Sequence, residues 1–198
     1  NQADKKLFSQ FRKYKTFVAA STHNTEELFA AKTHILLKKK IKNIITIIIP
    51  RHINRVDQII SQINELGLNA ISRRSNKKKL DNIDIYLVDT FGESKKFYKF
   101  ATTVFLGGSI IKRGGQNPLE PARFGAKILH GPNIDNFRDV YKYLNQLKIS
   151  SSINSPQQCA NSITFKKNMK KVKKMKYLST TILKKTLNEL DKSIHNEI

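Results

Sequence analysis

The sequence predicts an α/β fold with a mostly parallel, Rossmann-like sheet flanked by helices. Short runs of β-branched and apolar residues alternate with segments whose apolar residues recur at helical spacing. The strongest run, residues 44–50, carries no charged side chain, as expected of a strand buried on both faces. Polar and glycine-rich loops follow the strands, and ligands bind at this end of such sheets.

The elements follow in a regular order of strand and helix. We expect strands at residues 16–21, 44–50, 69–72, 83–89, 103–107 and 127–130. We expect helices at residues 25–37, 54–66, 93–100, 118–124 and 137–147. Gly67 ends the second of these helices, whose apolar face consists of Val56, Ile59, Ile60, Ile63 and Leu66. Residues 73–81 are polar and predict a solvated loop.

Length alone favours one domain or two small ones, and a change of composition separates residues 1–165 from a C-terminal extension, residues 166–198. The extension holds ten lysines, three acidic residues and no Gly or Pro, and its helical apolar spacing predicts one or two amphipathic helices. No apolar run approaches the roughly 20 residues that a membrane-spanning helix needs. The chain starts at Asn1 without an initiator Met, as expected of a piece of a longer protein. A lone Cys159 indicates a reducing compartment.

The formal net charge of +22 has two explanations that the sequence leaves open. Such an excess is typical of proteins that bind polyanions or an anionic membrane surface. However, the basic residues are mostly Lys and accompany many Ile and Asn, as an A+T-rich coding sequence would produce. A basic nucleic-acid-binding domain is one alternative function. Base stacking needs several aromatic side chains, and residues 166–198 contain only Tyr177, so we expect no nucleic acid partner.

Candidate binding residues follow three of the predicted strands. Ser21 and His23 follow the first strand and precede a helix, a position that suits an anionic ligand. Arg51, after Pro50 at the end of the second strand, could pair with a phosphate through its guanidinium. Residues 92–93 (Gly92, Glu93) follow the strand at 83–89, where the glycine could let the backbone approach a ligand.

The most informative segment is the glycine-rich block at residues 107–121. Its backbone N–H groups and the helix start that follows predict a phosphate cradle, although the block matches neither a Walker loop nor the dinucleotide fingerprint. Glu120 stands three residues after Asn117, so it could complete a capping box or accept hydrogen bonds from a ribose diol. Asn24 and Glu27 also have capping-box spacing. The candidate residues of the block are Ser109, Gly114, Gly115, Asn117 and Glu120.

Taken together, these loops resemble the donor-binding half of the Kdo transferases of lipopolysaccharide synthesis. The resemblance spans about residues 17–143. It rests on Ala20-Ser21-Thr22-His23, Pro50-Arg51-His52, Asp89-Thr90-Phe91-Gly92-Glu93 and the block at residues 107–121. It implies the C-terminal half of a GT-B glycosyltransferase, which transfers Kdo from CMP-Kdo to a lipid A precursor with inversion and without a metal ion or other cofactor. The resemblance also places the enzyme at the cytoplasmic face of the bacterial inner membrane.

Residue by residue, the resemblance implies a nucleotide-sugar site but no catalytic residue in this chain. The matching positions are Ser21, Pro50 and Arg51 around the cytidine and its phosphate, Gly92 and Glu93 in the same pocket, and Asn117 and Glu120 at the ribose. The family's acceptor site and catalytic carboxylate belong to the N-terminal domain, so the isolated chain is expected to be inactive. Expected partners are CMP-Kdo, the lipid A precursor and, through lysines at residues 166–176, an anionic membrane surface.

Two points qualify the resemblance. The chain has Asn24-Thr25 where the family usually has Pro-Gly, and we expect only a small backbone adjustment there. The glycine-rich block alone would also fit a UDP-sugar-dependent GT-B glycosyltransferase or epimerase, and the segments at residues 21–23 and 50–52 favour CMP.

Overall fold

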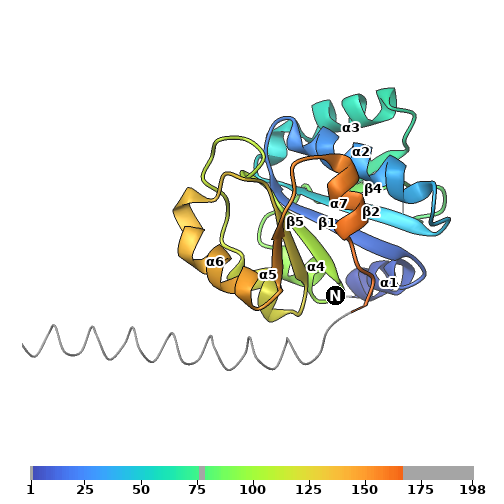
Figure 1. Cartoon of the computed structure of the whole chain (residues 1–198). Coiled ribbons are helices and arrows are strands. Elements are labelled where there is room, and N and C mark those ends of the chain that lie inside the picture. Colours follow the sequence, from blue (N-terminus) through green and yellow to red (C-terminus); the bar gives the residue numbers. More distant parts are fainter. Residues whose placement is uncertain (1, 76–78, 167–198) are drawn as a thin grey trace, which may run out of the picture.

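The computed structural model describes residues 2–75 and 79–166 and contains one seven-stranded parallel sheet (Figure 1). The strand order is β3-β4-β2-β1-β5-β6-β7. The strands are β1 (Lys15–Thr22), β2 (Ile44–Pro50), β3 (Ala70–Ser72), β4 (Ile85–Leu87), β5 (Thr103–Leu106), β6 (Lys127–His130) and β7 (Ser150–Ser152). The predicted α/β fold class is confirmed.

Helices cover both faces of the sheet. In Figure 1, α2 (Glu26–Lys38), α3 (Val56–Glu65) and α7 (Pro156–Ser162) lie on one side. The other side carries α1 (Gln2–Phe11), α4 (Ser94–Tyr98), α5 (Leu119–Arg123) and α6 (Arg138–Gln146). Two short 3-10 helices, η1 (Ile53–Arg55) and η2 (Asp135–Phe137), precede α3 and α6.

The apolar run of β2 fits its position inside the sheet, between β4 and β1. All seven of its residues are buried. Successive side chains of a strand point to opposite faces, so Ile45, Ile47 and Ile49 enter the core under α1, α4, α5 and α6. Ile44 and Ile48 enter the core under α2, α3 and α7. A strand that supplies two cores has no polar face, and its one polar side chain, Thr46, is buried with its hydroxyl against His34.

The predicted strands and helices are confirmed, with ends that differ by a few residues. The sequence prediction missed α1, β7 and α7. Helix α1 is largely polar, but its last residue, Phe11, is buried in an aromatic cluster and lies 5.1 Å from the ring of Tyr86. Strand β7 consists of three serines, so its sequence carries no apolar signal; pairing with β6 defines it. The helices predicted for residues 166–198 lie outside the described residues, apart from Lys166.

The capping box predicted for Asn24 and Glu27 is wrong. Asn24 does not cap α2, because its side chain accepts a hydrogen bond from Arg55, which also donates to Glu27. Thr25 is the N-cap, and it keeps a left-handed backbone with φ of 76° at the position where the sequence analysis noted a glycine in the family. At this position a β-branched residue adopts a conformation that favours glycine.

Candidate functional site

The strand order places a topological switch point between β1 and β5. From β1 the chain proceeds to β2 on one side, whereas β5 lies on the other side and leads to β6. In a doubly wound sheet such a switch point leaves the carboxyl ends of neighbouring strands open to a ligand. Residues 21–24 leave β1 here and residues 107–110 leave β5, as predicted from the sequence. We call this edge the carboxyl-end site.

The centre of the carboxyl-end site is filled by a carboxylate of the chain itself. Glu26, in the first turn of α2, is fully buried. It accepts hydrogen bonds from the backbone N–H groups of His23 (3.0 Å), Gly108 (2.7 Å), Ser109 (3.1 Å) and Ile110 (3.0 Å). We call these four N–H groups the Glu26 nest. The prediction that the glycine-rich block cradles a ligand phosphate is therefore wrong for residues 108–110, because Glu26 already occupies their N–H groups.

The predicted site residue Ser109 joins two loops. It is fully buried, and its hydroxyl donates to the carbonyl of Leu106 and accepts from the N–H of Gly131 at 2.8 Å. Its carbonyl accepts from the side chain and the N–H of Asn133. These contacts fix the loop after β5 to the loop after β6, so Ser109 has a structural role whether or not a ligand is bound.

Gly114 and Gly115 form the turn that follows. Their φ angles are 77° and 76°, in the left-handed region that glycine adopts without strain. A Cβ at Gly114 would lie 2.6 Å from the side-chain Cγ of Asn136. The N–H of Gly115 donates to the carbonyl of Gly108 at 2.8 Å. The two glycines therefore fold the block back onto its own beginning.

Cationic side chains surround the nest on its exposed side. Arg51 is exposed at the end of β2, and its backbone N–H donates to the carbonyl of Thr22 at 2.9 Å. Arg113 is exposed in the glycine-rich block. Among the described residues, neither guanidinium forms an ion pair. Both are therefore available to an anion that approaches the carboxyl-end site, as the sequence predicted for Arg51 but not for Arg113.

Two histidines lie beside the nest, His23 with its Nδ1 atom 3.8 Å from the Glu26 carboxylate. The rings of His23 and His52 are 5.7 Å apart and perpendicular. The Nδ1 atom of His23 lies 3.1 Å from the carbonyl oxygen of Ser21. Burial lowers the pKa of His23, and this effect outweighs the opposing attraction of Glu26. His23 is therefore neutral near pH 7 and can donate or accept a hydrogen bond. Ser21 itself has a φ of 54°, which turns the chain sharply out of β1.

Glu93 is a member of an ion-pair cluster. Its carboxylate accepts hydrogen bonds from Arg73, from Lys96 at 2.7 Å and from the hydroxyl of Thr90. Arg73 and Lys96 also bind Asp4 of α1. Burial raises the pKa of Glu93, but these hydrogen bonds outweigh it and hold the pKa below its ordinary value. We call Asp4, Arg73, Glu93 and Lys96 the Arg73 cluster. Arg73 was not among the predicted site residues, because its partners Glu93 and Asp4 are 20 and 69 residues away in the sequence.

Glu120 and Gly92, two further predicted residues, face solvent. Gly92 is exposed with φ of 74°, and nothing lies within 4 Å of the position of a Cβ there. Glu120 is 43% exposed and lies 3.5 Å from the ammonium group of Lys95. The side chain of Asn117 accepts a hydrogen bond from the N–H of Leu119, at the start of α5. Contacts of these three residues with a nucleotide remain predictions.

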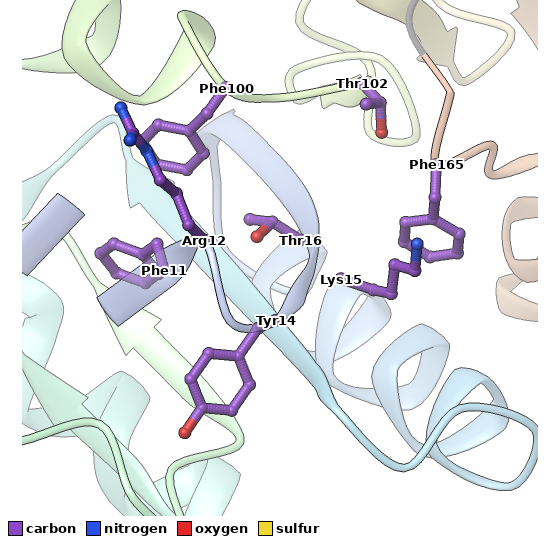
Figure 2. A pocket seen from close by; sticks show the side chains of 8 residues that line it. All are labelled: Phe11, Arg12, Tyr14, Lys15, Thr16, Phe100, Thr102 and Phe165. Atoms are coloured by element: carbon purple, nitrogen blue, oxygen red, sulfur yellow. The ribbon is translucent and has the colours of Figure 1, made fainter. Parts of the chain in front are cut away.

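A cavity of about 240 Å³ lies at the opposite edge of the sheet, near the amino ends of β1 and β5 (Figure 2). It is lined by Phe11, Arg12, Tyr14, Lys15, Thr16, Phe100, Thr102 and Phe165. None of the predicted site residues lines it, so this cavity is not the predicted nucleotide site.

Other kinds of site have little support. Among residues 2–75 and 79–166, no group of three or more His, Cys, Asp or Glu side chains could hold a metal ion. None of the described helices combines the length and the apolar character needed to cross a membrane. Burial raises the pKa of the Cys159 thiol to about 12, so it is not a nucleophile at neutral pH.

The fold and the carboxyl-end site define a Rossmann-like domain of the kind that binds anionic nucleotides. The chain is 32% identical to a 3-deoxy-D-manno-octulosonic acid transferase of Haemophilus influenzae over 139 residues, 70% of this chain and 33% of that protein. It is also 32% identical to the enzyme of that name from Rickettsia prowazekii, over 90% of this chain and 39% of the relative. No family model matches the chain. The chain is thus related by sequence to the Kdo transferases, and the resemblance seen in its loops is confirmed.

A solved structure supports the same relationship at the level of the fold. The C-terminal CMP-Kdo binding domain of WaaA from Acinetobacter baumannii matches with a TM-score of 0.69 and 23% sequence identity. The match covers 81% of this chain and 86% of that domain. By contrast, the chain spans only about a third of the length of the curated relatives named above.

Proposed function

We propose that this chain binds CMP-Kdo at the carboxyl-end site and forms the donor-binding half of a Kdo transferase. The observation that carries the proposal is the position of Arg51. This residue presents an exposed guanidinium without an ion pair in the described structure, at the end of β2, next to the strand β1 that borders the switch point. The domain from Acinetobacter baumannii, which shares this fold, binds CMP-Kdo, and the single phosphate of that donor suits a guanidinium.

The chain's own residues divide the task of binding. Arg51 pairs with the phosphate, and Arg113 adds a second positive charge on the other side of the nest. His23, neutral near pH 7, contributes a hydrogen bond without adding charge. Glu120 accepts hydrogen bonds from the ribose diol when it leaves Lys95, which is inexpensive because exposed ion pairs contribute little.

The whole reaction needs parts that these residues do not supply. We propose that the acceptor site for the lipid A precursor and the catalytic carboxylate lie in the remaining two thirds of the protein, and that this chain alone has no transferase activity. Transfer proceeds with inversion and without a metal ion or other cofactor. The enzyme works at the cytoplasmic face of the inner membrane, where its acceptor is embedded.

A thermal-shift series with CMP, UMP and duplex DNA tests the nucleotide preference. A ligand that binds only the folded state at a hundredfold excess over its Kd stabilises it by about 2.7 kcal/mol, or about 5–10 °C for a domain of this size. We expect this shift with CMP, a smaller one with UMP, and little dependence of either on salt. Binding of DNA through the net charge of +22 should instead weaken strongly between about 50 and 200 mM salt.

Arg51→Ala and Arg123→Ala form a matched pair for the same assay. Both arginines are exposed, but Arg123 lies in α5. Loss of the phosphate contact should weaken CMP binding about tenfold in Arg51→Ala and leave it unchanged in Arg123→Ala. A preference for UMP would support a UDP-sugar enzyme instead. Salt-resistant DNA binding without any shift by CMP would contradict the Kdo transferase proposal.

We propose a membrane contact for the lysine-rich segment at residues 166–176. Basic residues near an anionic surface contribute about 1 kcal/mol each. Co-sedimentation with vesicles tests this, and binding should require anionic lipid and should weaken at high salt. Equal binding to neutral and anionic vesicles would mean that the lysines form only a solvated surface.

A further inference from the structure

The Glu26 nest lies at the carboxyl ends of β1 and β5, where a nucleotide-binding sheet receives its ligand. Consecutive backbone N–H groups of a glycine-rich loop at the carboxyl end of a strand form a place where such folds hold a ligand phosphate. Here the same groups point at a fully buried side-chain carboxylate. A phosphate that entered the nest would have to displace a charge that four hydrogen bonds already satisfy.

The loop after β5 is also shaped around this carboxylate. A Cβ at Gly107 would lie 2.7 Å from Oε2 of Glu26 and 2.6 Å from Cα of Thr22, so the residue cannot carry a side chain without displacing its neighbours. Gly108, the next residue, has φ of 66°, and a Cβ there would lie 3.5 Å from Cε1 of His23 and 3.5 Å from Cβ of Arg113. The segment that Glu26 holds is therefore the one against which His23 and Arg113 pack.

We propose that Glu26 is a positioning residue: an internal anion that fills the nest, fixes residues 107–110 and keeps the donor phosphate outside, on Arg51 and Arg113. The role in donor binding rests on the proposed function, whereas the filling of the nest does not. Removal of the carboxylate should leave an empty anion site of the size of one carboxylate group. A small external carboxylate should then be able to replace it.

Glu26→Ala provides the test, with formate as the probe. Without formate the variant should unfold at a temperature about 5 °C lower or more, and its affinity for CMP should fall about tenfold or more, because hydrogen bonds to a charged group are lost. Formate at about 100 mM should bind the folded state and restore much of both losses. The same formate should change neither property in the unaltered chain.

Glu27→Ala is the matched control. Glu27 is the adjacent residue and is also buried, but its carboxylate pairs with Arg55 and accepts no N–H group of the nest. This variant should lose stability without recovery in formate. Equal recovery of both variants, or none in Glu26→Ala, would overturn the proposal. So would tighter binding of CMP by Glu26→Ala, because it would place the donor phosphate inside the nest.

Two further measurements separate a failure of the proposed function from a failure of the proposal for Glu26. If the unaltered chain fails to bind CMP, the proposed function fails, but recovery of the melting temperature by formate still tests the nest. If Glu26→Ala does not fold, Glu26→Gln retains the shape of the side chain and removes its charge. Hydrogen exchange at the N–H groups of residues 108–110 should then be faster than in the unaltered chain, and unchanged exchange would overturn the proposal.

Discussion

Arg73→Ala should destabilise the chain, because one guanidinium joins three separate segments. Arg73 donates through Nε and Nη2 to Glu93, and through Nη2 to Asp4 at 2.6 Å. It also lies over the ring of Phe97, 5.9 Å from its centroid. The side chains of Arg73, Glu93 and Asp4 are only 14%, 13% and 19% exposed, so the pairs are poorly screened by water.

The size of the effect follows from what remains after the substitution. Breaking a buried ion pair by removing one partner costs about 3–5 kcal/mol, because the other charge stays buried. Lys96 keeps its contacts with both carboxylates, at 2.7 and 2.8 Å, and reduces this loss. We therefore expect about 3 kcal/mol, which is about 6–12 °C in melting temperature for a chain of this length.

The effect should depend on pH in a defined direction. Hydrogen bonds from Lys96 and Arg73 lower the pKa of Asp4 below its ordinary 3.8, and the pKa of Glu93 lies below its ordinary 4.5. A carboxylate with a lowered pKa stabilises the folded state above its unfolded pKa and loses this contribution as pH falls. The difference between the unaltered chain and Arg73→Ala should therefore be complete near pH 7 and shrink below about pH 4.

Urea unfolding at pH 7 measures this difference, with Arg74→Ala as the control. Arg74 is the next residue and is exposed, and it contacts Asp89 through its backbone N–H, which alanine retains. Arg74→Ala should change stability by less than about 0.5 kcal/mol. If Arg73→Ala is no less stable than Arg74→Ala, the cluster contributes nothing and the reasoning from burial is refuted.

Three further predictions concern a buried histidine within α2, the N-cap of the same helix and the ribose contact. Burial lowers the pKa of His34, whose ring lies 2.9 Å from the hydroxyl of Thr46, so the unfolded chain takes up the proton first as pH falls. Because of this group, the free energy of unfolding should decline below about pH 6.5 by up to about 1.4 kcal/mol per pH unit. Urea midpoints measured at several pH values should depend less steeply on pH in His34→Gln. An unchanged pH dependence would exclude His34 as the cause. Thr25→Gly should raise stability by about 0.5–1 kcal/mol, since a β-branched residue is strained at φ of 76°, whereas Thr25→Ala should give no such gain; equal effects of glycine and alanine in urea unfolding would argue against strain. Glu120→Gln should cost less than about 1 kcal/mol of stability, because the pair with Lys95 is exposed, but should weaken CMP binding about tenfold in calorimetry. Unchanged CMP affinity would mean that Glu120 does not hold the ribose.

The sequence predicted those elements whose signal is local. The run at residues 44–50 and the apolar face of α3 both result from burial of one segment, so periodicity alone identifies them. Strand β7 has no such signal: its residues form a strand only because β6 offers an unpaired edge. The polar helix α1 is similar, because Phe11 and Asp4 have their partners far along the chain.

In the candidate site, the sequence likewise predicted what depends on local signals but not what depends on distant partners. The loops could be located, because they follow predicted strands and lie at one edge of the sheet. The partner of each side chain could not be predicted. Spacing suggested that Glu27 caps α2, but its carboxylate accepts a hydrogen bond from Arg55. Spacing also suggested that the N–H groups of the glycine-rich block bind a ligand, but they donate to Glu26. Glu26 is 82 residues from Gly108, and no local pattern reports a contact over that distance.

A loop that is held by a carboxylate of its own protein is expected to keep its shape when the proposed nucleotide binds. Ordering a flexible segment costs roughly 1–2 kcal/mol per residue in conformational entropy, and a preorganised segment avoids this cost at the moment of binding. The entropic penalty of nucleotide binding by this domain should accordingly be small, and amide exchange at residues 107–110 should be slow even in the free protein. Selection among nucleotides then depends on a rigid surface, with little contribution from a loop that closes over its ligand.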